Sequence, residues 1–558
     1  MSATIDASII LSFLNTNTIA YFCAEYSLAE KLPFFAGGLG VLAGDFLMEM
    51  SDQREKACIA VGLLYRKGYM SQQISKEANV YSEDKLNIED TNLKLLISNG
   101  EPIRVSLDIS GRTVKVQAYV TFVGHVPLLL LDTNLEENDA ESQLITDRLY
   151  GGNREHRFEQ EMVLGLGGAL MLQKLGIVPA IYHLNEGHSA LLIFEIAFQQ
   201  WQRNKKQSYF ESLESLKNVV FTNHTLVASG NDMFSTSLVY SHLSNYATQK
   251  SIDPQRLISY GLVEDASLFS LTLLALRLAT VSQAVSIYHS KRALSVWPNY
   301  PMIPITNGVN QKYWQAGNIV TAKDDETLWD AHLQNKQVLC DYIAKQVGVT
   351  WKKDELVIAW TRRIAGYKRP MILFDDVKQL TAIIRSQNFP VRLLISGKPH
   401  YGDDEGQEFL RKILDLVGKS DGYIVYLQNY DRDLARLILA GVDVLVNSPV
   451  RGFEACGTSG MKSGLNGVLS CATLDGWVNE VDWSGIGWVL ESDHFSNDFY
   501  KILEHEIMPL YYLKDSNGVP FHWVQRMKNM IKLTSEKFTT KRMVNELVEK
   551  VYSQLGGV

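Results

Sequence analysis

The chain has 558 residues, several times the usual size of one domain, so we expect two or three domains with large cores. Apolar residues make up 46% and charged residues 21%, which excludes a disordered, fibrous or low-complexity chain. The 62 acidic residues outnumber the 54 basic ones, and the net charge of −8 leaves no overall field to attract a phosphate backbone, so we expect no nucleic-acid partner.

The cysteines and the amino terminus indicate the compartment. The five cysteines are an odd number without a C-x-x-C pair, so we expect neither a disulfide framework nor a metal site. The first residues lack the basic region and cleavage site of a secretory signal, and no run of 18 apolar residues occurs. We therefore expect a soluble, cytoplasmic protein that does not bind a membrane.

The first half of the chain mixes two periodicities. Residues 19–26 form a strand-like run, and a glycine-rich turn then leads to an amphipathic helical pattern over residues 41–50. Alternating apolar residues between 103 and 131 flank a Ser110-Gly111-Arg112 turn, which predicts hairpins. Helical spacing returns over residues 155–175, followed by a strand at 180–184 and a helix at 189–201.

The second half alternates regularly between strands and helices. Apolar strands are predicted at residues 355–360, 391–396, 423–427 and 442–446, and a helical pattern follows each one. This order predicts βαβ units in a doubly wound parallel sheet. Two such lobes joined near residue 310 would place a cleft at the carboxyl ends of their strands, where open α/β sheets bind ligands.

Three segments after predicted strands contain residues suited to chemistry. Gly37-Gly38-Leu39-Gly40 opens a predicted helix, where backbone N–H groups can approach an anion, although a tight strand-to-helix turn needs the same glycines. Four cations lie between Arg362 and Arg369, and such clustering in an acidic protein suits a phosphate. The alternative is a solvated basic helix start paired with Asp375 and Asp376.

The third segment runs from Arg451 to Gly467 and follows the strand at 442–446. It holds Lys462 in a turn bracketed by glycines, so that its amine could reach a bound ligand, for example an aldehyde cofactor. Because many turns contain lysine, the spacing alone leaves a purely structural role open.

Eight blocks of the sequence together resemble the α-glucan (glycogen, starch and maltodextrin) phosphorylase family, in particular its short prokaryotic-type branch. They occur in the family's order at residues 35–45, 149–153, 183–189, 221–225, 305–309, 363–369, 454–462 and 474–477. The two most specific are the glycine turn that ends at Asp45 and the segment from Glu454 to Lys462.

The resemblance implies an α/β fold with two Rossmann-like lobes and a cleft between them, the glycosyltransferase-B architecture. We expect an amino-terminal lobe at residues 1–310 on the glucan side of the cleft and a carboxyl-terminal lobe at 311–530. The remaining residues, 531–558, are expected to form a helix that packs back on the first lobe.

The resemblance also implies the reaction and its cofactor. We expect pyridoxal 5′-phosphate linked to Lys462 and reversible phosphorolysis of terminal α-1,4-linked glucose from a glucan or maltodextrin. The products are α-glucose 1-phosphate, formed with retention of configuration, and a shortened glucan. In this family the phosphate of the cofactor, and not its aldehyde, exchanges protons with the substrate inorganic phosphate.

Individual site residues are carried over from the family on their positions in these blocks. Arg363 and Lys368 match phosphate ligands, and the turn containing Gly37, Gly38 and Leu39 points backbone donors toward the same anions. The sugar site is expected to use His188, His224, Asn307, Glu454 and Gly457, while Gly38, Gly457, Thr458 and Lys462 contact the cofactor. We count Lys462, Arg363, Lys368 and His224 as catalytic.

Structural roles are the alternatives for several of these residues. Glu454 could be a buried carboxylate paired with Arg451, and a lone histidine in a strand-end turn is more often structural than catalytic. We assign such a structural role to His183.

Departures from the family pattern are expected to tune the sugar site or the cofactor contacts. The chain has Ala365 where long animal-type phosphorylases have His, Asp431 where they have Arg, and Cys456 where Ser is usual. Gly452 and Asn153 replace Pro and Asp. The chain begins just before the first block, so we expect no regulation through an amino-terminal extension. The resemblance allows a homo-oligomer, but no pattern fixes one.

Two other functions share part of this pattern. A nucleotide-sugar glycosyltransferase such as a glycogen synthase would have two lobes and a similar glycine turn, but no use for a cofactor lysine. A glucan-binding protein without turnover would keep the fold, but it would not need Arg363, Lys368 and Lys462 together.

Overall fold

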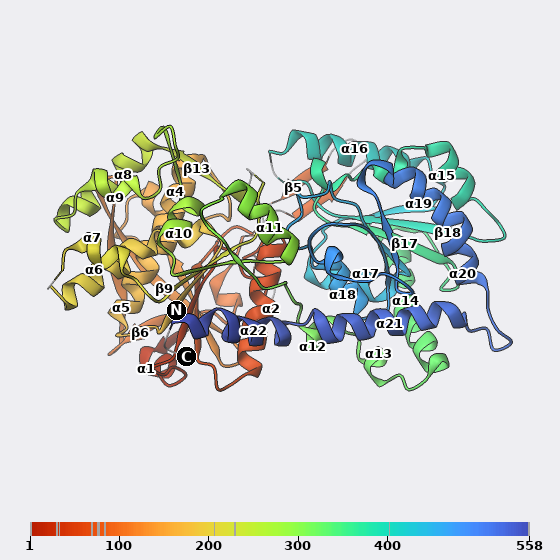
Figure 1. The fold of residues 1–558 in the computed structure, drawn as a ribbon, viewed down its shortest axis with the longest axis horizontal. Coiled ribbons are helices and arrows are strands. Elements are labelled where there is room, and N and C mark those ends of the chain that lie inside the picture. The colour runs from red at the N-terminus through yellow and green to blue at the C-terminus, as the bar shows by residue number, and fades with distance from the viewer. Residues whose placement is uncertain are drawn as a thin grey trace. The chain divides into compact units, whose positions relative to one another are not determined.

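A computed structural model describes residues 3–28, 32, 34–68, 71–74, 79–82, 85–205, 207–227, 230–400 and 402–555. The chain divides into two compact units. The first contains Met1–Ser71, Glu83–Ile305 and Met543–Val558, and the second contains Gln72–Ser82 and Thr306–Arg542. Each unit has its own sheet covered by helices, so the fold is mixed α/β (Figure 1).

The sheet of the first unit has a parallel region of seven strands. Their spatial order is β10 (Val126–Asp132), β3 (Cys58–Leu63), β2 (Ile19–Phe22), β11 (Ile181–Asn185), β12 (Val219–Asn223), β15 (Val281–Ala284) and β16 (Ile303–Pro304). Strands β2, β3, β10, β11 and β12 are buried throughout. Such continuous burial is typical of parallel strands with both faces covered.

An antiparallel region extends this sheet beyond β10. It contains β9 (Arg112–Val123), β8 (Arg104–Ile109), β6 (Lys94–Ser98), β7 (Glu101–Pro102) and β1 (Thr4–Asp6). Strands β8 and β9 form a hairpin whose turn residues Ser110 and Gly111 both have positive φ. The hairpins predicted over residues 103–131 are therefore confirmed.

Helices of the first unit follow the strands. They are α1 (Ala7–Leu11), α2 (Gly38–Asp52), α3 (Ala140–Gln143), α4 (Arg154–Met162), α5 (Gly168–Lys174), α6 (Leu192–Arg203), α7 (Tyr209–Glu214), α8 (Thr236–Gln249), α9 (Pro254–Ser259), α10 (Leu271–Leu278) and α11 (Ile287–Val296). A π-helical turn, Val163–Gly167, joins α4 to α5, so the predicted helix over 155–175 is one continuous segment. A short ribbon of β13 (Met233–Ser235) and β14 (Leu268–Ser270) lies beside α8 and outside the large sheet.

The second unit contains a six-stranded sheet in which every pair of neighbours is parallel. The spatial order is β19 (Ile424–Leu427), β18 (Val391–Ser396), β17 (Leu356–Thr361), β20 (Val444–Asn447), β21 (Leu469–Thr473) and β22 (Trp488–Leu490). The chain order of the strands therefore reverses between β17 and β20. This is the doubly wound order with a switch point, where ligands of such sheets bind.

Helices connect and cover the strands of this second sheet. They are α12 (Gln311–Trp314), α13 (Gly317–Thr321), α14 (Asp325–Val347), α15 (Val377–Ile384), α16 (Asp404–Gly418), α17 (Arg432–Gly441), α18 (Ser459–Gly464), α19 (Phe495–Ile502), α20 (Met508–Tyr512) and α21 (Phe521–Lys537). In the view of Figure 1, α15 and α16 lie above the strands β17 and β18, and α14 and α21 lie below them. The four strands predicted in this half are confirmed, whereas β21 and β22 were not predicted.

A segment from the first part of the sequence belongs to the second unit. Strands β4 (Ser71–Ile74) and β5 (Asn79–Ser82) pair with each other. The Gln72 backbone N–H donates to Asn429 Oδ1 at 2.5 Å, and Asn429 Nδ2 donates back to the Gln72 carbonyl at 2.9 Å. The Ile74 N–H donates to Gln428 Oε1 at 3.1 Å. These bonds fix the segment at the end of β19.

The last residues of the chain belong to the first unit. Helix α22 (Thr540–Lys550) leads to Tyr552, whose hydroxyl lies 2.6 Å from His183 Nδ1. The other ring nitrogen of His183 lies 2.7 Å from Thr222 Oγ1, and burial lowers the pKa of this histidine to about 3. His183 is thus a neutral core residue with both nitrogens bonded, as its assigned structural role requires.

A fully buried polar cluster anchors the amino ends of β17 and β20. Asp443 bonds His332 Nε2 at 2.8 Å, the Val357 N–H at 2.6 Å and Lys336 Nζ. Lys336 also donates to the Tyr511 hydroxyl at 2.8 Å. A buried charge pair needs such additional hydrogen bonds to offset its desolvation, so the cluster holds α14, α20 and the sheet in one arrangement.

None of the helices within the described ranges has both the length and the apolar composition that a membrane span requires.

Candidate functional site

An ion cluster lies at the carboxyl edge of the second sheet. Arg362 directly follows β17, and Glu454 lies in the loop after β20. Arg362 Nη2 donates to both carboxylate oxygens of Glu454, at 2.6 and 2.8 Å, and Lys368 Nζ donates to Glu454 Oε2 at 2.7 Å. The switch point between β17 and β20 therefore carries two cations gathered around one carboxylate.

Electrostatics within the cluster favour the charged forms. Burial raises the pKa of Glu454, but Arg362 and Lys368 outweigh it and hold the pKa at about 2. Burial also raises the pKa of Tyr367, yet Lys368 and Arg363 bring it below its ordinary value. A tyrosine with a lowered pKa next to the cluster indicates an excess of positive potential there, which is what an incoming anion requires.

Arg362 is a site residue that the sequence did not single out from the other cations. Its side chain is buried, and its Nη1 has no hydrogen-bond partner among the residues that the structure describes. An unsatisfied guanidinium nitrogen at a buried position costs free energy unless a ligand accepts its hydrogen bond. The position of Arg362 directly after a buried strand could have identified it as a site residue, but Arg363 has almost the same position.

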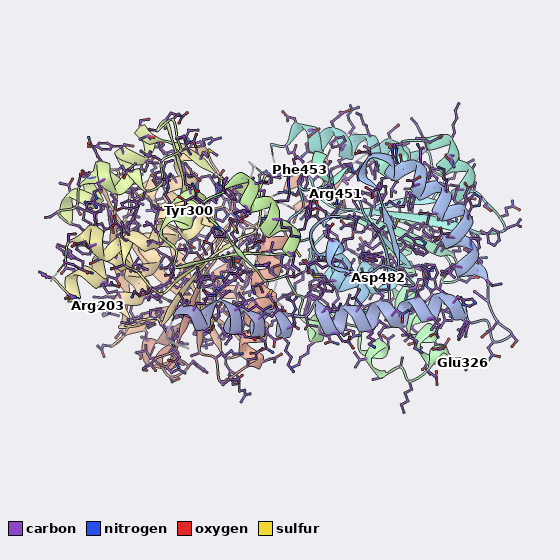
Figure 2. The ribbon with its side chains drawn as sticks, in the orientation of Figure 1. Arg203, Tyr300, Glu326, Arg451, Phe453 and Asp482 are labelled. Carbon is purple, nitrogen blue, oxygen red and sulfur yellow. The ribbon has the colours of Figure 1, made fainter. Side chains whose placement is uncertain are left out.

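Arg363, predicted as a phosphate ligand, has an exposed side chain. Its Nη2 donates to the Tyr367 hydroxyl at 3.2 Å, so it is joined to the turn that carries Lys368. Arg451, the partner predicted for Glu454 in its structural role, is also exposed, and so is its neighbour Phe453 (Figure 2). The structural role proposed for Glu454 therefore involves Arg362 and Lys368 instead of Arg451.

The last cation, Arg369, holds the loop between β20 and Glu454. Its Nε donates to the Ser448 carbonyl at 2.7 Å, and its Nη2 donates to the Pro449 carbonyl and to Thr473 Oγ1, each at 3.1 Å. A solvated basic helix start would leave these cations in water. Instead, Arg362 and Arg369 bond the strand-end loops.

Lys462 lies on the short helix α18 and is 7% exposed. Its Nζ lies 4.3 Å from the ring centre of Trp314, which belongs to α12. The amine is therefore held against an aromatic wall, and Trp314 is a second site residue that the sequence did not identify.

Residues 456–458 connect Glu454 to α18. A Cβ at Gly457 would lie 1.9 Å from Glu454 Oε1, so only glycine fits beside this carboxylate. Thr458 is the residue before α18, and its carbonyl accepts from the Lys462 N–H at 3.1 Å. Asn307 is buried and donates to the Cys456 carbonyl at 3.4 Å. Asn307, which follows β16, is thus joined by this hydrogen bond to the loop that carries Glu454 and Gly457.

In the first unit, the side chain of Glu25 binds backbone N–H groups where the glycine turn at residues 37–40 begins. Glu25 accepts from the Ala36 and Gly37 N–H groups at 2.7 and 3.1 Å, and from the Tyr150 hydroxyl at 2.8 Å. Gly37 therefore directs its N–H to Glu25. Gly38 and Leu39 are the first residues of α2, where backbone N–H groups precede the regular helical bonding.

His224 follows β12 and lies next to the end of β11. Asn185 Nδ2 donates to Cys23 Sγ at 3.2 Å, so its Oδ1 is the acceptor for His224 Nε2 at 2.5 Å. Burial lowers the pKa of His224 to about 3, and its neutral ring keeps Nδ1 as an acceptor. Its backbone N–H donates to Glu186 at 2.8 Å, and burial raises the pKa of Glu186 to about 7.

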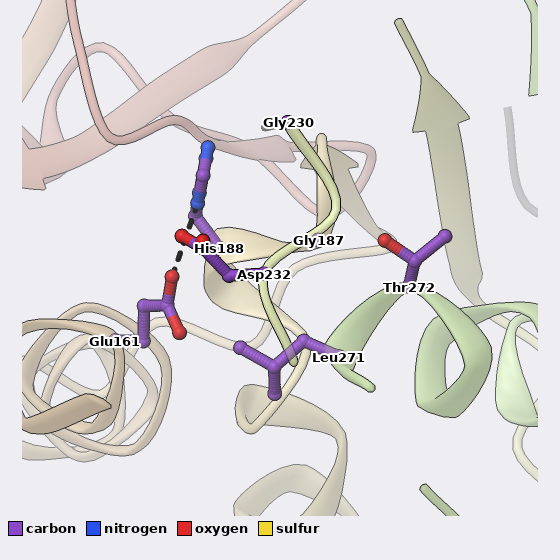
Figure 3. A pocket seen from close by; sticks show the side chains of 7 residues that line it. All are labelled: Glu161, Gly187, His188, Gly230, Asp232, Leu271 and Thr272. Carbon is purple, nitrogen blue, oxygen red and sulfur yellow. Dashed lines mark hydrogen bonds and ion pairs between the residues drawn. The ribbon is translucent and has the colours of Figure 1, made fainter. Parts of the chain in front are cut away.

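His188 lines a small polar cavity of about 10 Å³ in the first unit. Figure 3 shows its ring and Glu161 pointing toward each other, and His188 Nδ1 lies 3.2 Å from Glu161 Oε1. Asp232, Thr272, Leu271, Gly187 and Gly230 complete the lining. Burial raises the pKa of Glu161 in spite of His188 and Arg157.

Comparisons with known proteins identify the family of this chain. The family model described as carbohydrate phosphorylase matches residues 318–486. The chain is 34% identical to the maltodextrin phosphorylase of Thermococcus litoralis over 96% of this chain and 70% of that protein. The chain belongs to the carbohydrate phosphorylase family.

Further relatives extend the match over almost the whole chain. The glycogen phosphorylase of Aquifex aeolicus is 32% identical over 96% of this chain and 86% of that protein. The glycogen phosphorylase of Mycobacterium tuberculosis is 30% identical over 98% of this chain and 72% of that protein. The family resemblance predicted from the sequence blocks is thereby confirmed, and the ion cluster at Arg362, Lys368 and Glu454 lies within the segment that the family model matches.

Proposed function

We propose that this carbohydrate phosphorylase catalyses the reversible phosphorolysis of terminal α-1,4-linked glucose from a glucan or maltodextrin. The products are α-glucose 1-phosphate, with retained configuration, and a shortened glucan. Family membership supports the reaction class. The observation that carries the proposal is the pair of cations, Arg362 and Lys368, held at the switch point of a parallel sheet.

The described residues that best support the proposal are those suited to bind the substrate phosphate. Arg362 and Lys368 are already ordered by Glu454, so a phosphate does not have to immobilise two long side chains by itself. Arg362 Nη1 is a buried donor without a partner in the described part of the chain, and an anion oxygen would satisfy it. Arg363, exposed beside Tyr367, can contribute a third cation, and a second guanidinium, from the solvent side.

The residues around Lys462 fit the pyridoxal phosphate that the family implies. A primary amine is the group that links this cofactor, and the Trp314 ring at 4.3 Å offers a flat apolar wall for its pyridine ring. When bound, the cofactor would supply a second phosphate for proton exchange with the substrate phosphate. Lys462 would hold it, and Thr458 and Gly457 would lie beside it on the same loop.

The sugar-binding roles are part of the same proposal. Glu454 presents its carboxylate on the loop before α18, where Gly457 leaves room beside it, and Asn307 bonds the Cys456 carbonyl of the same loop. His224 keeps Nδ1 as an acceptor for a sugar hydroxyl, and His188 lines the cavity in the first unit. The Gly38 and Leu39 N–H groups at the start of α2 remain proposed anion donors.

The two-lobed architecture with a cleft belongs to this proposal as well. It is supported by the parallel strands of each unit and by the doubly wound order of the second sheet. The cytoplasmic location and a homo-oligomeric state remain predictions from the sequence.

Direct assay tests the proposal. Purified protein incubated with maltoheptaose and inorganic phosphate should release glucose 1-phosphate, and the reverse reaction should release phosphate. Transfer from a nucleotide-sugar without any response to phosphate would instead indicate a glycosyltransferase. Glucan binding without glucose 1-phosphate, in protein saturated with pyridoxal phosphate, would indicate a binding protein without turnover.

A further inference from the structure

Asp475 lies in the loop after β21 and is buried, yet it has no ion-pair partner within the described ranges. Its Oδ2 accepts from the Gly452 N–H at 3.0 Å and from the Glu454 N–H at 2.9 Å. Its Oδ1 accepts from the Gly476 N–H at 2.9 Å. One carboxylate therefore binds the backbone of the very residue that orders the two cations.

The neighbouring glycine makes a second contact with the same loop. A Cβ at Gly476 would lie 2.8 Å from the Ala455 carbonyl oxygen and 3.0 Å from Cys456 Cα, and its φ is +50°. The loop after β21 thus packs directly against the backbone on both sides of Glu454. Close approach of this kind leaves no room for a side chain.

The opposite end of the Glu454 loop is fixed by other residues. Arg369 bonds the Ser448 and Pro449 carbonyls, and the Val450 N–H donates to the Tyr367 carbonyl at 2.7 Å. Asp475 is the only described side chain that bonds the backbone N–H of Glu454. The position of the Glu454 carboxylate therefore depends on Asp475.

We propose that Asp475 is a positioning residue, which sets the place of Glu454 and through it the order of Arg362 and Lys368, and so determines the affinity for phosphate. This rests on the proposed phosphorolysis. Burying a carboxylate without a paired cation lowers the free energy of unfolding, so stability alone does not explain an aspartate at this position. Its three backbone donors all lie in the two loops that form the site.

An Asp475→Asn variant provides the main test. The asparagine carboxamide has one oxygen, so it cannot accept both from the Gly452 and Glu454 N–H groups and from the Gly476 N–H group. Its NH₂ group would then face a backbone N–H donor. Full-length protein with pyridoxal phosphate is assayed for its KM for inorganic phosphate and its KM for maltoheptaose. We expect the phosphate KM to rise about tenfold, equivalent to the loss of one charge-assisted hydrogen bond. The glucan KM should rise by a smaller factor, because Glu454 also belongs to the proposed sugar site.

Two further variants separate positioning from stability. Asp475→Glu keeps both acceptor oxygens and should recover part of the phosphate affinity, and it also serves if the asparagine variant does not fold. Asp324→Ala removes the side-chain cap of α14, which accepts from the Thr327 N–H at 2.8 Å, and is the control for a general loss of stability in the same unit. It should lower the melting temperature but leave the phosphate KM unchanged.

A binding readout that needs no turnover completes the test. Inorganic phosphate should raise the melting temperature of the wild-type protein and raise that of Asp475→Asn much less. An unchanged phosphate KM in Asp475→Asn, or equal increases of both KM values, overturns the positioning role while leaving the proposed function intact. A wild-type protein that makes no glucose 1-phosphate overturns the proposed function, and the phosphate-dependent melting then still decides the role of Asp475.

Discussion

One nitrogen of Arg362, Nη2, bonds both carboxylate oxygens of Glu454, whereas the other terminal nitrogen, Nη1, is buried and finds no partner within the described ranges. Half of the guanidinium fork is thus used within the protein and half is available to a ligand. Arg forks bind planar or tetrahedral anions through both nitrogens, so the arrangement fixes the residue and still leaves it able to recognise a phosphate oxygen.

Replacing Glu454 by Gln should leave Arg362 and Lys368 close together without their counter-charge. We expect a loss of about 3 to 5 kcal/mol in the free energy of unfolding, the usual cost of removing one partner of a buried pair. Inorganic phosphate should restore part of it, because the anion compensates the same cations. Thermal unfolding with and without phosphate measures both effects.

The matched control for this variant is Glu355→Gln. Glu355 pairs with Arg392 at 2.6 Å and lies just before β17, at the amino end of the strand. It should lose stability that phosphate does not restore. Equal rescue of the two variants would contradict a specific anion site at Glu454.

Acid should weaken the second unit through the same carboxylate. The pKa of Glu454 falls from 4.5 to about 2 in the fold, so its stabilisation is fully present above pH 4.5 and is lost as the pH falls toward 2. The shift corresponds to a free energy on the order of 3 kcal/mol. Denaturant unfolding of wild type and Glu454→Gln between pH 6 and pH 3 should therefore give curves that converge at the acid end, and parallel curves would show that the lowered pKa is wrong.

Arg363→Ala should raise the phosphate KM by roughly tenfold or more, because one charge-assisted contact of about 1.5 to 3 kcal/mol is removed. Binding of maltodextrin should be unaffected. Arg385, exposed and paired with Asp421 at 2.5 Å, provides a control substitution to alanine with the same change of charge. Equal weakening of phosphate and glucan binding would argue against the assigned role of Arg363.

The lysine that carries the cofactor can be identified chemically. Reduction of the holoprotein with borohydride followed by peptide mapping should place pyridoxal phosphate on Lys462, and Lys462→Ala should lose the cofactor absorbance. Lys336 is an internal control, because it is also buried but is bonded to Asp443 and Tyr511. A modification at any lysine other than position 462 would refute the assignment.

Local patterns were enough to predict much of the second sheet. Continuous apolar runs fixed β17, β18, β19 and β20 to within two residues, because buried parallel strands leave a strong signal. The strand β22 has only three residues, Trp488–Leu490, and is too short to give a pattern. Because the cations directly follow the predicted strand β17, their location at the carboxyl edge of the sheet could be predicted as well.

The pairing inside the candidate site could not be predicted in the same way. Arg362 and Glu454 are 92 residues apart in sequence, and only the strand order brings them together. The sequence offered Arg362 and Arg363 as equivalent neighbours, yet one is buried and the other exposed, which depends on the twist of the chain leaving β17. The bond from Gly37 to Glu25 likewise requires a partner from another loop.

The hydrogen bond between Tyr552 and His183 has a consequence for biosynthesis. Residues close to the carboxyl terminus complete the core of a unit that is otherwise assembled from the first 305 residues. During translation, that unit must wait with His183 uncovered until α22 and Tyr552 have left the ribosome. A nonsense mutation before codon 552 should therefore destabilise the part of the protein that was synthesised first.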